Sequence, residues 1–411
     1  MTEINDQDLK DIINGAALLG SGGGGSLELG YYLATFINCP VQLKEVEELG
    51  VDDWGAVILG ISAADASLPD NTRSSNASPK VLLNKKMFRS LKGVEQYPIE
   101  IQILIATFEY LQTALKMDKD FSYSLAGEIG TANLLAAMLT ANAHHIPVVD
   151  ADGAGRSLPE LSLCTYYWSD IPIYPSTLAN IKPEQDKQVK AVIDAKTSSI
   201  MARFAEKIVG TEEFGFQGVM ATYAMNGQTI RDRKPVIKGT ITKALQIGAI
   251  LREAKQKQLN PITVLIDFLN NGCSADNKNA FLLFQGKITE VKQEEDPRFQ
   301  SGTLTLRNQN KEVRVDYLNE NLIAWQGGRP IAMGPDLICY LTPEGIPLTN
   351  ADNLKDKKGS ELALIGLKAP EQLRQDSIIK AFMDLIAGLG YKGNYVPIEK
   401  LQKEQASTTC S

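Results

Sequence analysis

The amino-acid sequence predicts an α/β protein with two domains. We expect an N-terminal α/β domain with a parallel or mixed sheet, followed by a second mixed domain that is rich in strands. A strand–helix–strand pattern with short joints occupies residues 121–149, and short alternating apolar runs with turn residues between them fill residues 281–348. The sequence pattern changes after Trp168, where proline-containing segments follow. We therefore predict domains over 1–168 and 169–411, with a frayed tail over about 405–411.

The composition is that of an ordinary globular protein. Of the 411 residues, 44% are hydrophobic and 22% are charged, and the net charge is −7. An acidic chain lacks the basic surface that nucleic acid requires. The N-terminus shows no signal peptide, and no apolar run is long enough for a membrane span. The five cysteines are scattered, with no Cys-x-x-Cys pair, which favours a reducing compartment. We therefore expect a cytoplasmic protein with no nucleic-acid or membrane partner.

The first distinctive feature is a run of four glycines between two predicted helices. Asn5 or Asp6 can cap a helix over 7–19, and Ser26 can cap a second helix over 27–36. A glycine loop at a helix N-terminus can present N–H groups to an anion, whereas the alternative is a flexible turn or a close approach of helices. The run carries no nucleotide-binding fingerprint. The candidate substrate-binding residues here are Ser21, Gly22, Gly23, Gly24 and Gly25.

The middle of the first domain contains further predicted elements. Residues 55–61 form an apolar run typical of a buried strand, and residues 62–80 form a long polar loop. Helical patterns follow over 85–92 and 99–116, although the alternation that begins at Ile99 also fits a strand.

Residues 121–149 form the most informative unit. A strand over 121–126, a helix over 131–143 and a strand over 146–149 predict a right-handed parallel crossover. Ligands bind beyond the carboxyl ends of such strands. This geometry places Glu128 at the same edge of the sheet as Asp150 and Asp152.

Beyond Trp168, segments 170–175 and 181–183 look like a linker. Helical patterns near 191–208, from about 240 to 256 and over 371–389 alternate with a strand over 214–224 and with the strand-rich region.

The residues at the predicted sheet edge suggest acid–base chemistry. The candidate catalytic residues are Glu128, Asp150, Asp152 and Glu160, and further candidate substrate-binding residues are Asn133 and Arg156. Gathered carboxylates can supply a general base and an acid, or they can hold a divalent metal ion. The alternatives are turn and cap roles for the acids and a structural clamp for Arg156.

Other common reaction centres have less support. Only His144 and His145 supply imidazole, and no Gly-x-Ser-x-Gly elbow is present. Cys164 is either a nucleophile or, as is more common for free cysteine, a small buried apolar residue. The identity of any cofactor stays open.

Three segments, Leu18–Gly25, Glu128–Asn133 and Pro147–Glu160, resemble the S-methyl thiohydantoin desulfurase-like family. Similar stretches of its second domain are Lys238–Leu245, Phe284–Ile288, Asn319–Asn321 and Tyr391–Pro397.

The resemblance implies a two-domain architecture and a hydrolase that acts on a sulfur-bearing, hydantoin-like ring, in association with hydantoin or oxoproline catabolism. Water would attack the ring carbon that bears sulfur, a thiol or sulfide would depart, and Glu128, Asp150 or Asp152 would be the base. Thr131, Ala154 and Leu158 depart from the family pattern and leave the substrate open. The alternative is a non-catalytic binding or accessory protein of such a system. A small-molecule ring is the expected partner, and a homo-oligomer stays open.

Overall fold

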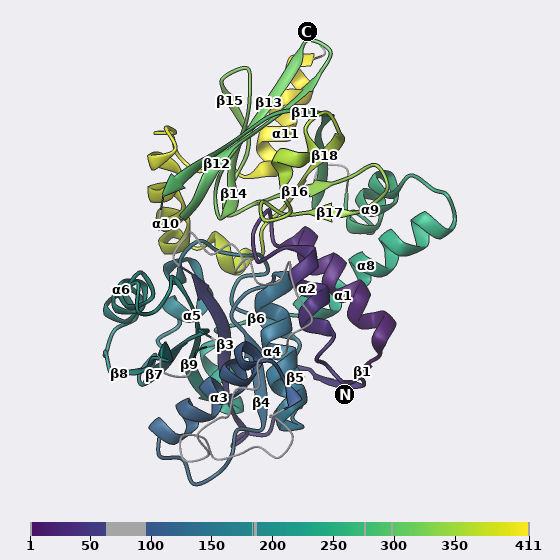
Figure 1. The fold of residues 1–411 in the computed structure, drawn as a ribbon. Coiled ribbons are helices and arrows are strands. Elements are labelled where there is room, and N and C mark those ends of the chain that lie inside the picture. Colours follow the sequence, from purple (N-terminus) through teal and green to yellow (C-terminus); the bar gives the residue numbers. More distant parts are fainter. Residues whose placement is uncertain are drawn as a thin grey trace.

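A computed structural model describes residues 2–62, 96–182, 184, 187–274, 277–296 and 299–409. Two large sheets lie at opposite ends of the described structure, with the helices α1, α2 and α8 between them (Figure 1). The helix predicted over 85–92, and all but the first residue of the loop predicted over 62–80, lie outside these residues.

The first sheet is mixed, as predicted. Eight of the described strands pair in the order β1-β2-β5-β4-β3-β9-β7-β8. Its parallel centre consists of β2, β5, β4 and β3, and the flanking pairs are antiparallel. The strands are β1 (Thr2–Ile4), β2 (Val41–Lys44), β3 (Trp54–Ser62), β4 (Tyr123–Ala126), β5 (Val148–Val149), β7 (Ser176–Asn180), β8 (Lys190–Ile193) and β9 (Gln217–Asn226).

The first two helices begin where their capping residues predict. In α1 (Asp6–Leu19) the Asn5 side chain accepts hydrogen bonds from the first turn, and Ser26 does the same for α2 (Leu27–Ala34). Segment 99–116, which fitted either a helix or a strand, is the helix α3 (Ile99–Ala114). The crossover helix α4 (Thr131–His144) joins the neighbouring parallel strands β4 and β5.

The chain returns to the first sheet after Trp168. The segments predicted to be a linker flank β7, which pairs with β9, and β9 pairs with β3. The predicted division after Trp168 therefore falls within the chain that builds this sheet. The helix expected from Ala191 begins at Ser198 as α6 (Ser198–Val209), because Thr197 caps it and residues 190–193 pair with β7 as β8.

The strand-rich prediction for the second domain is confirmed. A second group of eight described strands pairs in the order β15-β14-β13-β12-β11-β18-β16-β17, with every pair antiparallel. Bulges interrupt several pairs and let the sheet curl. The strands are β11 (Ala280–Asp296), β12 (Phe299–Asn308), β13 (Lys311–Leu318), β14 (Glu320–Gln326), β15 (Arg329–Met333), β16 (Leu337–Leu341), β17 (Pro347–Leu348) and β18 (Glu361–Leu367).

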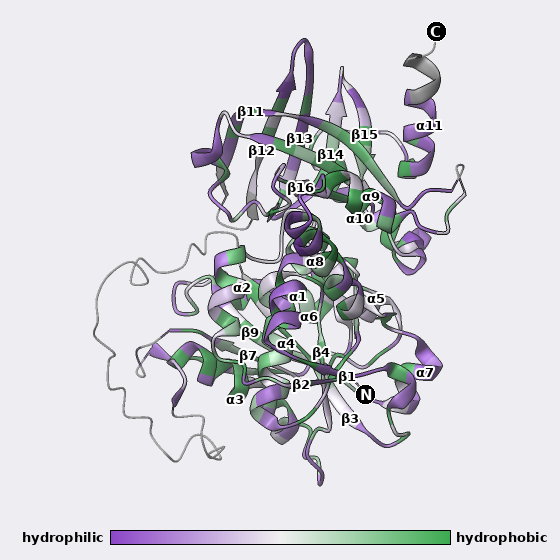
Figure 2. Cartoon of the chain, turned by 90° about the vertical axis from the view of Figure 1, so that its right-hand side faces the viewer, coloured by the Kyte–Doolittle hydropathy of each residue, from purple (hydrophilic) through white to green (hydrophobic). Residues whose placement is uncertain are grey.

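Helix α8 (Thr240–Gln256) lies between the two sheets and crosses α1 at very short range (Figure 2). A Cβ atom on Gly15 would lie 1.8 Å from the Ala244 carbonyl oxygen, and one on Gly248 would lie 1.9 Å from that of Asp11. The Arg252 guanidinium donates to both oxygens of Asp11 at 2.9–3.1 Å beside this crossing. Glycine at both positions is what lets the backbones meet.

The remaining helices complete the fold. They are α5 (Thr165–Trp168), α7 (Gly227–Arg233), α9 (Pro261–Leu269), α10 (Asp376–Gly388) and α11 (Ile398–Thr409), and the short strands β6 (Ala151–Asp152) and β10 (Ile237–Lys238) pair with each other. The tail predicted to fray from Gln405 is helical as far as Thr409, because α11 buries Ile398 and Leu401. None of the described helices is long and apolar enough to cross a membrane.

Candidate functional site

The candidate site lies where the parallel strands β4 and β5 end. Glu128 follows β4 by two residues, Asp150 follows β5 directly, and Asp152 is the last residue of the short strand β6. Because the two strands are parallel neighbours, their carboxyl ends meet at one edge. The charge of Glu128 contributes to the pKa of Asp152, which agrees with their predicted proximity.

Glu128 is a partly exposed residue whose carboxyl group is hydrogen-bonded on both oxygens. Asn133 of α4 donates to it at 2.6 Å, the Ser157 hydroxyl at 2.9 Å and the Leu158 backbone N–H at 2.7 Å. Burial raises its pKa to about 7, although these donors and the Arg156 charge act in the opposite direction. A carboxyl group with this pKa is divided between its two protonation states at neutral pH.

Asp152 is completely buried and is bound by its own loop. The backbone N–H of Ala154 donates at 3.0 Å, and that of Gly155 donates at 2.9 and 2.8 Å to the two carboxyl oxygens. Burial raises the pKa of Asp152 to about 7 despite these bonds. The loop that follows β5 therefore holds a second group that titrates near neutrality.

Asp150 has a different set of partners. Its carboxylate accepts hydrogen bonds from the N–H groups of Ile241 and Thr242 at 2.8 and 3.0 Å, and from the Thr242 hydroxyl at 2.5 Å. These donors are the first turn of α8, so Asp150 caps a helix that lies 90 residues further along the chain. The cap role, which the sequence left open, is the one that these contacts support.

Arg156 is fully buried and joins the two domains. Its guanidinium donates to the carbonyl oxygens of Ser157, Pro335, Asp336 and Asn321 at 2.9–3.1 Å. Burial lowers the pKa of Arg156, and the charges of Glu320, Cys339, Asp336 and Glu128 raise it. Of the two predicted roles, these contacts favour the structural clamp, although the clamp still places a positive charge beside the carboxyl groups.

The glycine run approaches another part of its own chain. A Cβ atom on Gly23 would lie 2.0 Å from a carboxyl oxygen of Glu320, and one on Gly24 would lie 2.4 Å from the Ser157 hydroxyl. Ser21 is buried, and its hydroxyl accepts a hydrogen bond from the Ile338 N–H at 2.8 Å. The loop thus lies between the rim of the first sheet and the second domain, where side chains larger than hydrogen would not fit.

Glu320 is the site residue that sequence reasoning missed. It is buried, one of its carboxyl oxygens has no hydrogen-bond partner among the described residues, and the Gly24 backbone N–H donates to the carboxyl group. Burial raises its pKa well above the usual range, the charge of Glu128 raises it further, and Arg156 opposes both. The anion-holding geometry expected of the glycine loop is thus directed at the chain's own carboxyl group. The signal in the sequence that could have identified Glu320 was the stretch Asn319–Asn321, which resembles the family's second domain.

Two other candidates are arranged less like a reaction centre. Glu160 accepts a hydrogen bond from the Ser162 hydroxyl at 3.0 Å, and its charge raises the pKa of Glu206 on α6. Burial raises the pKa of Cys164 to about 12, and its thiol donates to the Leu161 carbonyl at 3.0 Å. A thiol with this pKa is a weak nucleophile at neutral pH.

The rim can therefore bind and release a proton near neutral pH. Within the described ranges, no group of three or more histidine, cysteine, aspartate or glutamate side chains is arranged to hold a metal ion. The arrangement fits general acid–base chemistry by carboxyl groups with raised pKa values.

Comparison with known proteins agrees with this architecture. A family model described as "S-Me-THD-like, N-terminal domain" matches residues 7–187, and one described as "S-Me-THD-like, C-terminal domain" matches residues 197–398. An X-ray structure of a protein from Chromobacterium violaceum is similar, with a TM-score of 0.75 and 24% identity over 97% of this chain and 100% of that one. At this identity the likeness supports the fold alone. No curated protein matches the chain significantly.

Proposed function

Because this chain belongs to the S-Me-THD-like family, we propose that it is a hydrolase that acts on an S-methyl thiohydantoin or a related cyclic amide ring. In this proposal, a carboxylate at the edge of the first sheet activates the water molecule that attacks the ring.

The observation that carries the proposal is the pKa of Glu128, about 7, on a residue that is not fully buried. A general base is most effective when its pKa is close to the working pH, and such a base typically contributes about 10²–10⁴-fold to the rate. Asp152 has a similar pKa but is fully covered, so Glu128 is the better candidate to contact water. We assign Asp152 to positioning, since it holds the loop that leads to Arg156 and Ser157.

In the proposed reaction, ionised Glu128 removes a proton from water as the oxygen forms a bond to the ring carbon that bears sulfur. The C–S bond then breaks, and the electron pair leaves with the thiolate. The proton held by Glu128 neutralises the departing thiolate, and the proton of the added hydroxyl moves to the ring nitrogen. Water is consumed, and a ring carbonyl, a ring N–H and a thiol are produced. The charge that develops on the ring requires a nearby donor or cation, and the Arg156 guanidinium, whose charge acts on Glu128, is our candidate for it.

The direct test is release of methanethiol from S-methyl thiohydantoins by the intact chain, with Glu128→Gln as the variant. We expect kcat/KM to rise with pH through about 7, as Glu128 ionises, and the variant to lose at least about 100-fold in kcat. Glu361→Gln, which changes an exposed glutamate at the start of β18, is the matched control.

Two outcomes would count against the proposal. Full activity in Glu128→Gln would remove this residue as the base. Saturable binding of hydantoins and thiohydantoins, with no turnover of any of them, would favour the accessory binding protein instead.

A further inference from the structure

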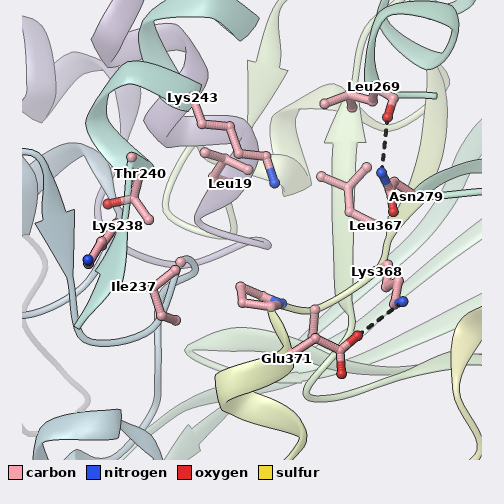
Figure 3. A pocket seen from close by; sticks show the side chains of 14 residues that line it. Leu19, Ile237, Lys238, Thr240, Lys243, Leu269, Asn279, Leu367, Lys368 and Glu371 are labelled. Carbon is pink, nitrogen blue, oxygen red and sulfur yellow. Dashed lines mark hydrogen bonds and ion pairs between the residues drawn. The ribbon is translucent and has the colours of Figure 1, made fainter. Parts of the chain in front are cut away.

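A cavity of about 360 Å³ lies at the junction of the two domains. One wall is the N-terminal end of α8, with Thr240 and Lys243, and the opposite wall is the segment from Leu367 to Glu371 (Figure 3). Gly155, whose N–H binds Asp152, also lines it. Lys243 extends from α8 into the space between these walls (Figure 3).

Three lysines line this cavity, and two of them are already neutralised. Lys238 forms an ion pair with Glu47, and Lys368 forms one with Glu371 at 3.1 Å. Lys243 has no ion pair and no hydrogen bond to any residue in the part of the chain that the structure describes. Lys243 is partly exposed and lines the cavity, and the burial of part of its side chain lowers its pKa. A lysine without an acidic partner can form a charge-assisted hydrogen bond with an anion that enters the cavity.

The two acidic groups nearest to Lys243 do not neutralise it. Cys339 contributes to its electrostatics, but burial raises the pKa of this thiol to about 12, so that it is uncharged at neutral pH. Asp152 contributes less, and its oxygens are taken by the N–H groups of Ala154 and Gly155. The cavity therefore presents a lysine that forms no ion pair with any of the described residues.

The other walls indicate what kind of molecule would supply the missing negative charge. They are largely apolar, with Leu19, Ile237, Leu269 and Pro370 among the lining residues. The helix N-terminus itself is not available, because Asp150 occupies its N–H groups.

We propose that this cavity binds a small organic molecule with an apolar body and one carboxylate, and that the carboxylate pairs with the ammonium group of Lys243. This site goes beyond the proposed function and is independent of it. Binding here requires no turnover, and the hydrolysis proposed at Glu128 does not require this ligand.

The test is calorimetric binding of three acids and their uncharged amides to the full chain: phenylacetate and phenylacetamide, 4-methylpentanoate and its amide, and hydantoin-5-acetate and its amide. We expect at least one acid to bind at least tenfold more tightly than its own amide. Lys243→Met keeps an apolar side chain of similar length and should abolish this difference. Lys368→Met, which removes a lysine that already has a partner, should change the acid's affinity by less than about threefold.

Circular dichroism and thermal unfolding are the controls that test whether each variant is folded. The proposal is overturned if none of the acids binds more tightly than its amide, or if Lys243→Met binds the acid as the unaltered chain does. Loss of turnover in Glu128→Gln with intact acid binding would leave both proposals standing. Intact acid binding with no hydrolysis of any substrate would reject the proposed function alone.

Discussion

Asp150 and Asp152 are two residues apart on the loop that follows β5, yet they are bound in opposite ways. Asp150 receives its hydrogen bonds from the first turn of α8, far along the chain. Asp152 receives its backbone hydrogen bonds from Ala154 and Gly155 of its own loop and has a pKa near 7. Of the two, the first joins distant elements and the second responds to pH. A carboxylate in a polar loop therefore needs its partners identified before it can be given a role.

The largest expected effect concerns the response of stability to pH. Because the folded pKa of Asp152 is raised to about 7, its protonated form favours folding. That stabilisation is complete below about pH 4 and is lost as the pH rises towards 7. The free energy of unfolding of the unaltered chain relative to Asp152→Asn should therefore fall by roughly 2–3 kcal/mol between pH 5 and pH 8, at about 1.4 kcal/mol per pKa unit.

Urea unfolding of both proteins at the two pH values measures this difference. Asp170→Asn, at an exposed site, is the control and should show almost no such change. If the free energy of unfolding changes with pH by the same amount in Asp152→Asn and in the unaltered chain, Asp152 does not titrate in this range.

The next effect is the loss of the α8 cap. Asp150→Ala removes all three hydrogen bonds to the first turn of α8 and should lower the free energy of unfolding by about 1–2 kcal/mol. Asp150→Asn keeps a good capping side chain and should recover part of the loss. Denaturant unfolding at one pH measures both, and equal stability of Asp150→Ala and the unaltered chain would break the contrast between the two aspartates.

The smallest effect is expected at Glu320. Burial raises the pKa of Glu320 well above its usual range and so favours the neutral carboxyl group, which Glu320→Gln replaces with a neutral group of similar shape. The free energy of unfolding should change by less than about 1 kcal/mol. Were Glu320 ionised beside Arg156, removing its charge would instead cost about 3–5 kcal/mol, because a buried pair would be broken. Chemical denaturation at pH 7 distinguishes the two cases.

Local signals in the sequence predicted much of the first domain. The capping side chains of Asn5 and Ser26 identified the starts of α1 and α2, and the crossover from β4 to β5 placed Glu128 near Asp152. The return of β7, β8 and β9 to the first sheet was not predictable in this way. Pairing between strands so far apart in sequence depends on tertiary packing, and proline-containing segments on either side of β7 suggested a linker.

The candidate site was predicted only on the side that the first domain builds. Glu320 and Lys243 reach the rim and the cavity through β14 and α8, whose positions depend on how the two domains pack. In the sequence, an acid between two asparagines and a lysine on a helix look like ordinary surface residues. Their burial, and the absence of an ion pair for Lys243 among the described residues, become visible only when both domains are in place.

The glycine loop also constrains the order in which parts of the protein can fold during synthesis. Ser21 binds Ile338, which is 317 residues further along the chain, so the loop cannot reach its final environment until β16 has been synthesised. At about 5–20 residues per second, this takes roughly 15–60 s on a ribosome. During that interval the four glycines expose no apolar side chain to neighbouring nascent chains. The same residues that permit close packing in the finished protein therefore make this loop a poor starting point for aggregation before the second domain arrives.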